Sequence, residues 1–402
     1  MIDFPHLPRI IRKNDAKVLM LVLSGISGAP DPLFKRSELE AARVPNLDQI
    51  ARQSSGGLSV PVAPGISPGS AVGNLALLGY DPLKHFFGRG ALEAIGTGLE
   101  LEAGDIALRG NLARLDDDGV VADRRVCVNA SEEGAGLVAR LESVTVPGVD
   151  VAVKHSVGHR FAMRLRAPKL SPAITDTDPM EPGLPAMKCE PAERGGKATA
   201  DAVNAFVDGA SVALSGSEVA NSVLLRGASE PPNLASFNDT YQVNAAGIAS
   251  YPLYRGLARA VGMTVYPAEP NFLSHLEAVR KHWDDHDFFW VHYREPSALP
   301  DRYSFHDKKH AIELLDEHVR DFMDLDPDVL VVTGDHANPS GHPGHSWHGV
   351  PFVIRSEGTL GDSGVDRFNE RDLRTGSLGQ FEAKHAMMLI LAHAGKLKEY
   401  GA

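Results

Sequence analysis

Two stretches of the sequence carry residue types and spacings that could do chemistry. In the first, Ser70 stands at the start of a short, apolar expected helix, directly after the Pro/Gly-rich run V-A-P-G-I-S-P-G at 62–69. A serine there is either a helix N-cap, whose oxygen accepts from free N–H groups of the first turn, or a nucleophile at the positive end of the helix, where an alkoxide and a phosphate are both stabilised. Spacing alone leaves both roles open.

The second stretch is D-V-L-V-V-T-G-D-H at 328–336, a buried strand that ends in Asp335 and His336, with His345 soon after. Carboxylate and imidazole groups at a strand end suit Zn²⁺ or Mn²⁺. The alternative is a histidine-rich surface loop next to an unrelated Asp-His pair. Because the pair directly follows a strand, we favour a metal or anion site.

Strands of a parallel sheet would position these groups. The continuous apolar run K-V-L-M-L-V-L-S at 17–24 is typical of a strand buried on both faces, and polar residues after such strands lie where α/β proteins bind ligands. We expect further strands of this sheet at 222–227, 287–292, 328–336 and 351–356, and helices at 44–54, 197–214, 252–261, 307–323 and 382–394.

The hydrophobic pattern of the sequence changes between residues 106 and 220. Alternating apolar and polar residues at 106–115 and 151–165 indicate a half-buried antiparallel sheet. The sequence therefore predicts an α/β fold in which a mostly parallel sheet, formed by 1–105 and 221–402, is flanked by helices and interrupted by an inserted α+β domain at 106–220.

Composition limits the class of protein. The chain has 402 residues, 43% of them hydrophobic and 23% charged, and a formal net charge of -12, which argues against nucleic-acid and anionic-membrane partners. Cys127 and Cys189 form no CxxC site or disulfide framework. Neither a signal-peptide core nor a membrane-length apolar run is present, so we expect a cytoplasmic protein.

The sequence resembles the archaeal-type, cofactor-independent phosphoglycerate mutases of the alkaline phosphatase superfamily. The matching stretches are L-E-A-A-R-V-P-N-L-D, P-G-I-S-P-G-S, L-A-L-L-G-Y-D-P, G-R-G-A-L-E-A-I-G, D-D-D-G-V-V-A-D-R-R, D-T-D-P and V-V-T-G-D-H, and they run from end to end. The resemblance implies an alkaline-phosphatase-like core with an inserted substrate domain. It also implies that Ser70 accepts the phosphoryl group of 3-phosphoglycerate, activated by two divalent metals, usually manganese.

The sequence departs from the family pattern at several metal-ligand positions. Ser24 stands where the family has an aspartate, and Ala71 and Asn74 replace an acid and a histidine after the serine. Ser297 and Asp301 align with a further aspartate and histidine of the family. A dinuclear centre needs carboxylates to offset the repulsion of two cations, so these changes argue against it.

Three of the family's metal ligands are retained, namely Asp335, His336 and His345. We therefore expect one divalent ion, Mn²⁺ or Zn²⁺, in preference to two, with Asp301 and Ser24 as further candidate ligands. No organic cofactor is expected.

The residues that align with the family's substrate-binding residues match the family pattern better than the metal-ligand positions do. Each one singly could be a surface salt bridge, but as a set they predict that an anionic ligand is bound. The basic members of the set are Arg89, Arg109, Arg124, His159, Arg160, Arg226 and Arg255, and the acidic Asp123 is counted with them because it also matches the family pattern.

Two functions follow from these observations. The first is phosphoglycerate-mutase-like phosphoryl transfer through Ser70 on a small phosphorylated carboxylic acid, with altered or reduced metal dependence. The second is a catalytically degenerate relative that binds a phosphorylated metabolite or serves as a non-catalytic or specialised-pathway partner. Neither involves nucleic acid or membrane, and a homo-oligomer is left open.

Overall fold

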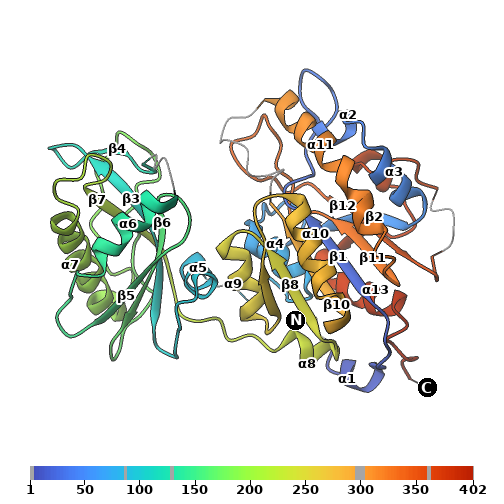
Figure 1. Ribbon diagram of the computed structural model, residues 1–402, viewed down its shortest axis with the longest axis horizontal. Coiled ribbons are helices and arrows are strands. Elements are labelled where there is room, and N and C mark those ends of the chain that lie inside the picture. Colours follow the sequence, from blue (N-terminus) through green and yellow to red (C-terminus); the bar gives the residue numbers. More distant parts are fainter. Residues whose placement is uncertain (1–3, 86–87, 127–130, 295–303, 360–363, 402) are drawn as a thin grey trace. The chain divides into compact units, whose positions relative to one another are not determined.

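The computed structural model describes residues 4–85, 88–126, 131–294, 304–359 and 364–401. They form two compact units, each with its own sheet and hydrophobic core (Figure 1). The first unit lies within Met1–Phe86, Leu234–Ser250 and Val261–Ala402, and the second lies within Phe87–Asn233 and Tyr251–Ala260.

The first unit is built on an eight-stranded sheet. Its strands are β1 (Val18–Leu23), β2 (Ser55–Val60), β8 (Ala245–Ala249), β9 (Thr264–Pro267), β10 (Phe288–Tyr293), β11 (Val329–Thr333), β12 (Val350–Ser356) and β13 (Gly379–Glu382). They lie in the order β13-β2-β12-β11-β1-β10-β8-β9. All neighbours are parallel except β12, which runs antiparallel to both β11 and β2. The mostly parallel α/β sheet expected from the sequence is confirmed.

Strand β1 lies at the centre of this sheet and is buried along its whole length. Its alternate leucines share one core with apolar residues of α3 (Pro45–Arg52), α10 (Phe272–Lys281) and α11 (Phe305–Met323), while its other residues are buried on the opposite face. The continuous apolar run at 17–24 therefore reflects a strand covered on both sides. The helices of the unit are α1 (Leu7–Ile10), α2 (Glu38–Ala41), α3 (Pro45–Arg52), α4 (Ser70–Leu77), α8 (Phe237–Tyr241), α10 (Phe272–Lys281), α11 (Phe305–Met323), α12 (Glu370–Leu373) and α13 (Ala386–His393), with short 3-10 turns at Trp283–Asp285 and Ala383–His385.

The parallel strands β1, β10 and β11 end at the same edge of the sheet. The register pairs Leu23 with Tyr293 and Val22 with Thr333. The residues that follow β1 and β11 therefore meet beside the end of β10, which is where α/β sheets build their sites.

The second unit holds a five-stranded antiparallel sheet. Its strands are β3 (Ile106–Leu115), β4 (Val121–Asp123), β5 (Asp150–His155), β6 (Arg160–Arg166) and β7 (Ser222–Ser229). Its helices are α5 (Arg89–Thr97), α6 (Ser131–Leu141), α7 (Lys197–Ala213) and α9 (Pro252–Ala260), with a 3-10 turn at Arg194–Gly196. The placement of 222–227 in the parallel sheet was wrong, because β7 pairs antiparallel with β3.

The second unit reaches beyond the range 106–220 on both sides. Helix α5 packs its small residues Ala91 and Ala94 against the sheet strands β3 and β6. Helix α9 packs on α5 through two glycines: a Cβ on Gly96 would lie 1.8 Å from Pro252 O, and one on Gly256 would lie 1.9 Å from Leu92 O. Small residues, which carry no hydrophobic periodicity, thus bring α5 and α9 into this unit.

No helix in the described ranges combines the length and apolar composition needed to cross a bilayer.

Candidate functional site

The Asp335 carboxylate is the centre of a buried polar network in the first unit. Its Oδ2 accepts hydrogen bonds from Ser24 Oγ at 3.1 Å and from Asn74 Nδ2 at 2.8 Å. His292 Nε2 lies 3.4 Å from the same oxygen, and the Gly25 N–H donates to Oδ1 over 3.1 Å. Each carboxylate oxygen therefore already has donors from this chain.

Burial alone would raise the pKa of the Asp335 carboxyl, but the ion pair with His336 and the hydrogen bonds from His292 and His336 hold this pKa well below its usual value. Burial lowers the pKa of His292. The site therefore holds an ionised carboxylate without exposure to water.

Ser70 is the first helical residue of α4, and the N-cap of that helix is Gly69. The structure thus rules out the N-cap role for Ser70. Its side chain makes no hydrogen bond to any other described residue, and the residue is 8% exposed. The hydroxyl is consequently free to face a ligand at the N-terminal end of α4, where the helix dipole favours an anion.

Two residues one turn further along α4 tie Ser70 to the Asp335 loop. Asn74 donates from Nδ2 both to Ser70 O, at 2.9 Å, and to Asp335 Oδ2. Gly73 lies so close to that loop that a Cβ there would be 2.0 Å from Asp335 O. From the sequence, Asn74 is recognisable only as a departure from the family pattern, and its contact with Asp335 is visible only in the structure.

His336 and His345 stack face to face, with ring centroids 3.7 Å apart. His345 Nδ1 lies 2.8 Å from Pro68 O, which places this ring beside the loop that leads into Ser70. His336 Nδ1 lies 2.7 Å from Asp335 Oδ1, and its Nε2 is buried without a hydrogen-bond partner within the described ranges. The structure therefore brings the Asp335, His336 and His345 side chains together.

These residues do not fit the two-metal centre that the family resemblance implies. Within the described part of the chain, no group of three or more carboxylate, imidazole or thiolate side chains could hold a metal ion. Ser24 and Asn74 approach Asp335 as hydrogen-bond donors. Ser297 and Asp301 lie outside the described residues.

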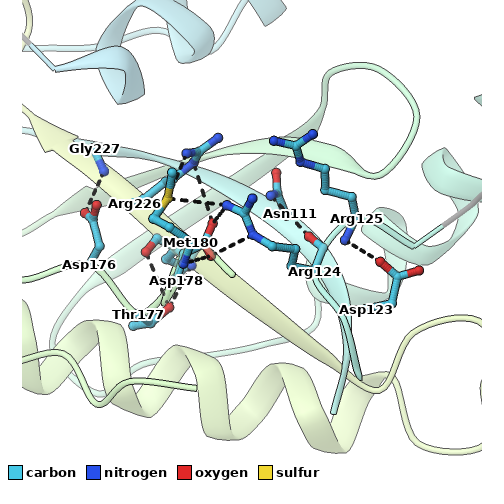
Figure 2. A network of polar contacts seen from close by, with 11 residues as sticks. Asn111, Asp123, Arg124, Arg125, Asp176, Thr177, Asp178, Met180, Arg226 and Gly227 are labelled. Atoms are coloured by element: carbon cyan, nitrogen blue, oxygen red, sulfur yellow. Dashed lines mark hydrogen bonds and ion pairs between the residues drawn. The ribbon is translucent and has the colours of Figure 1, made fainter. Parts of the chain in front are cut away.

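The second unit gathers arginines around the buried Asp178, as Figure 2 shows. Arg124 binds this carboxylate in bidentate fashion, through Nε at 3.1 Å and Nη2 at 2.7 Å. Arg226 Nε lies 3.8 Å from Asp178 Oδ2. Met180 Sδ lies 3.3 Å from a guanidinium nitrogen of each arginine. Asp178 thus neutralises Arg124 and leaves net positive charge in the cluster.

Arg109 supplies much of that positive charge. It lies on β3 directly opposite Arg226 on β7 and is 5% exposed, and its side chain makes no hydrogen bond or ion pair with another described residue. Burial, and then the proximity of Arg109, lower the pKa of Arg226 to about 10. Within the part of the chain that the structure describes, Arg109 is buried without a counter-ion, and the carboxylate nearest to Arg226 is already bound by Arg124. This excess of positive charge favours an anionic ligand.

His159 lies in the electrostatic field of these arginines. Burial, followed by the charges of Arg160, Arg109, Arg125 and Arg124, lowers its pKa to about 3. Its Nε2 is buried and has no hydrogen-bond partner in the described ranges. The imidazole is therefore neutral at pH 7 and offers one N–H and one lone pair to a ligand.

The other predicted ligand-binding residues divide into two groups. Arg89, the first residue of α5, contributes to the field at Arg226, and Arg160 lies 5.8 Å from the ring centre of Tyr251. Asp123 is exposed and accepts from the Arg125 N–H, and Arg255 interacts electrostatically with Arg259 and Glu93. No contact joins these last two to the arginine cluster among the described residues.

Sequence reasoning missed the acids that organise this cluster. Asp176 accepts from the Gly227 N–H at 2.9 Å, and Asp178 holds Arg124 (Figure 2). Both belong to D-T-D-P, which we used only as a family match. Two acids beside a proline in a loop were the available signal, because Asp in turns readily accepts hydrogen bonds and loops often carry binding residues.

Known proteins resemble this chain over nearly its whole length. The model of the 2,3-bisphosphoglycerate-independent phosphoglycerate mutase family matches residues 51–220. A probable 2,3-bisphosphoglycerate-independent phosphoglycerate mutase of Thermus thermophilus is 41% identical over 404 residues, covering 99% of each chain. One of Deinococcus radiodurans is 41% identical and covers 98% of each chain.

Solved structures also resemble this chain over nearly its whole length. A protein from Pyrococcus horikoshii is 27% identical with a TM-score of 0.81, covering 96% of this chain and 99% of that one. The cofactor-independent phosphoglycerate mutase from Thermoplasma acidophilum is 29% identical with a TM-score of 0.66, covering 94% and 100%. The chain therefore belongs to the family of 2,3-bisphosphoglycerate-independent phosphoglycerate mutases.

Proposed function

We propose that this chain carries out phosphoglycerate-mutase-like phosphoryl transfer on a small phosphorylated carboxylic acid of the 3-phosphoglycerate or 2-phosphoglycerate type. The observation that carries the proposal is the position of Ser70. Its hydroxyl is free of hydrogen bonds to described residues and stands at the first residue of α4. Family membership supplies the substrate class.

In the proposed reaction, Ser70 Oγ forms a bond to phosphorus as the bond from phosphorus to the substrate oxygen breaks. The serine proton is lost and the departing glycerate oxygen gains one. Return of the phosphoryl group to the other hydroxyl of glycerate reverses these changes and restores Ser70. The N-terminal end of α4 would stabilise the negative charge that develops on the phosphoryl group.

The arginine cluster of the second unit would bind an anionic group. Arg109 and Arg226 are the best placed, because Arg124 is already paired with Asp178. A planar guanidinium can grip a carboxylate or a phosphate with two parallel hydrogen bonds.

Membership of the family supports a divalent metal in general terms. For this chain we propose one ion per chain at most, because Asp335 is surrounded by neutral donors.

The direct test compares wild type with Ser70→Ala in conversion of 3-phosphoglycerate to 2-phosphoglycerate. We expect the substitution to abolish conversion, while Ser67→Ala, at an exposed position of the same loop, retains it. Incubation with labelled 3-phosphoglycerate should mark wild type and leave Ser70→Ala unlabelled. Equal turnover of the two proteins would refute Ser70 as the nucleophile.

A second candidate is a relative that binds the phosphorylated acid without turning it over. The observation that favours it is that no described residue accepts a hydrogen bond from Ser70 Oγ, so the described part of the chain places no base beside its proton. Calorimetric titration with 3-phosphoglycerate separates the two functions. Binding that Arg109→Gln weakens, with no conversion in wild type at any metal concentration, would favour the binding protein.

A further inference from the structure

Both oxygens of the Asp335 carboxylate are occupied by hydrogen-bond donors from the same chain. Ser24 comes from the end of β1, Asn74 from α4 and His292 from β10, and all three reach Oδ2. Oδ1 receives the Gly25 N–H and lies next to His336 Nδ1. Asp335 is 1% exposed, so water supplies little of its hydrogen bonding.

The orientation of the Asn74 amide is fixed by its neighbours. Its Nδ2 contacts two acceptors, Ser70 O and Asp335 Oδ2, at 2.9 and 2.8 Å. A flipped amide would set Oδ1 against two oxygens, so the nitrogen faces Asp335. An amide nitrogen donates and has no lone pair to give to a metal.

Ser24 is equally unsuited to a cation. Its Oγ donates to Asp335 Oδ2, so the hydroxyl hydrogen points at the lone pair that a metal ion would need. Both residues are neutral, which leaves Asp335 as the only carboxylate in this network of described residues. One negative charge does not offset a buried divalent ion, and still less two.

We infer that Ser24 and Asn74 close the Asp335 position to a divalent cation, and that the paired substitutions Ser24→Asp and Asn74→His would open it. Both side chains meet at one oxygen of Asp335. Their replacements would therefore bring two carboxylates and an imidazole to one point, which is a ligand set for Mn²⁺ or Zn²⁺. The inference concerns the metal and holds whether or not Ser70 transfers a phosphoryl group.

The test uses full-length proteins stripped with EDTA and titrated with Mn²⁺, with free Mn²⁺ followed by electron paramagnetic resonance and stability by the thermal midpoint. The proteins are wild type, Asp335→Asn, the Ser24→Asp/Asn74→His pair, and a matched control pair, Ser24→Asn/Asn74→His. The control has the same shape as the test pair but lacks the added carboxylate.

We expect wild type and Asp335→Asn to give the same Mn²⁺ titration. The test pair should gain a saturable site whose affinity exceeds that of the control pair by about tenfold or more. In EDTA the test pair should melt below wild type, because two adjacent carboxylates repel, and Mn²⁺ should restore its midpoint.

Two outcomes would overturn the inference. One is a saturable Mn²⁺ site in wild type that Asp335→Asn removes; this comparison stands even where the test pair fails to fold. The other is a site of equal affinity in the test and control pairs. Neither bears on phosphoryl transfer, which the Ser70→Ala assay tests separately.

Discussion

At the scale of single residues, His159 shows how the arginine field acts on a neutral neighbour. Its pKa of about 3 arises from burial first and from four nearby arginines second. The unfolded chain binds a proton on this residue near pH 6.5, whereas the folded chain does not. Because the unfolded state binds more protons, this residue reduces stability progressively as the pH falls from about 6.5 towards 3.

We therefore predict that His159→Gln loses less stability than wild type between pH 7 and pH 5. The expected difference is on the order of 1 kcal/mol, since His159 is partly exposed and solvent screens part of the penalty. Urea unfolding followed by far-UV circular dichroism at both pH values measures it. Titration of the His159 ring by NMR provides a direct check, and a midpoint near 6.5 would contradict the prediction.

In the first unit, the positions of polar residues were predictable where those residues directly follow a strand. Asp335 and His336 could be placed at the sheet edge because a buried strand precedes them. The Asn74 contact with Asp335 could not be predicted, because the two residues are 261 positions apart and no periodic pattern links them. The same holds for Asp178, whose partner Arg124 is 54 positions away.

At the scale of elements, the packing of α5 on α9 decides which helices belong to the second unit. Gly96 and Gly256 bring the two backbones into contact, and any side chain there would collide with a carbonyl oxygen. Glycine is a poor helix former, so these two residues lower the intrinsic stability of α5 and α9. They are needed because they let the two helix backbones approach each other closely.

We predict that Gly96→Ala destabilises the protein by about 1–3 kcal/mol through overpacking against Pro252 O. Gly136→Ala in α6 is the matched control, because nothing lies within 4 Å of its Cβ position, and it should be neutral or stabilise by up to about 1 kcal/mol. Chemical denaturation of both variants measures the effect. Equal stability of the two would show that the α5–α9 contact relaxes freely.

Most elements were predictable from hydrophobic patterns. The apolar runs at β1, β10 and β11 and the periodicity of α11 match the structure closely. Strand β7 was assigned to the wrong sheet, because a short apolar run fits a parallel or an antiparallel strand equally well. Its partner β3 is more than a hundred residues earlier, so only the fold reveals the pairing.

At the scale of the whole molecule, each of the two units has a large hydrophobic core, and in the described part of the chain these two cores share no residue. The core of the second unit draws on β7 as well as on β3 and β6. The range 106–220, expected from the sequence as the inserted domain, lacks both β7 and α5.

We predict that a fragment of residues 106–220 shows no cooperative thermal transition, because β3 loses its pairing with β7 and exposes apolar residues. A fragment of 88–233, which restores β7 and α5, should melt cooperatively. Circular dichroism of the two fragments provides the comparison. A sharp transition in the shorter fragment would mean that β7 is dispensable for this core.

The place of α9 also bears on recombination between relatives. The boundaries of the two units fall at four points along the chain, because residues 251–260 belong to the second unit while 234–250 belong to the first. A chimaera that imports the second unit from another family member therefore has four junctions. One that transplants 87–233 alone would pair a foreign α5 with a native α9, and the two glycines would have to match across species.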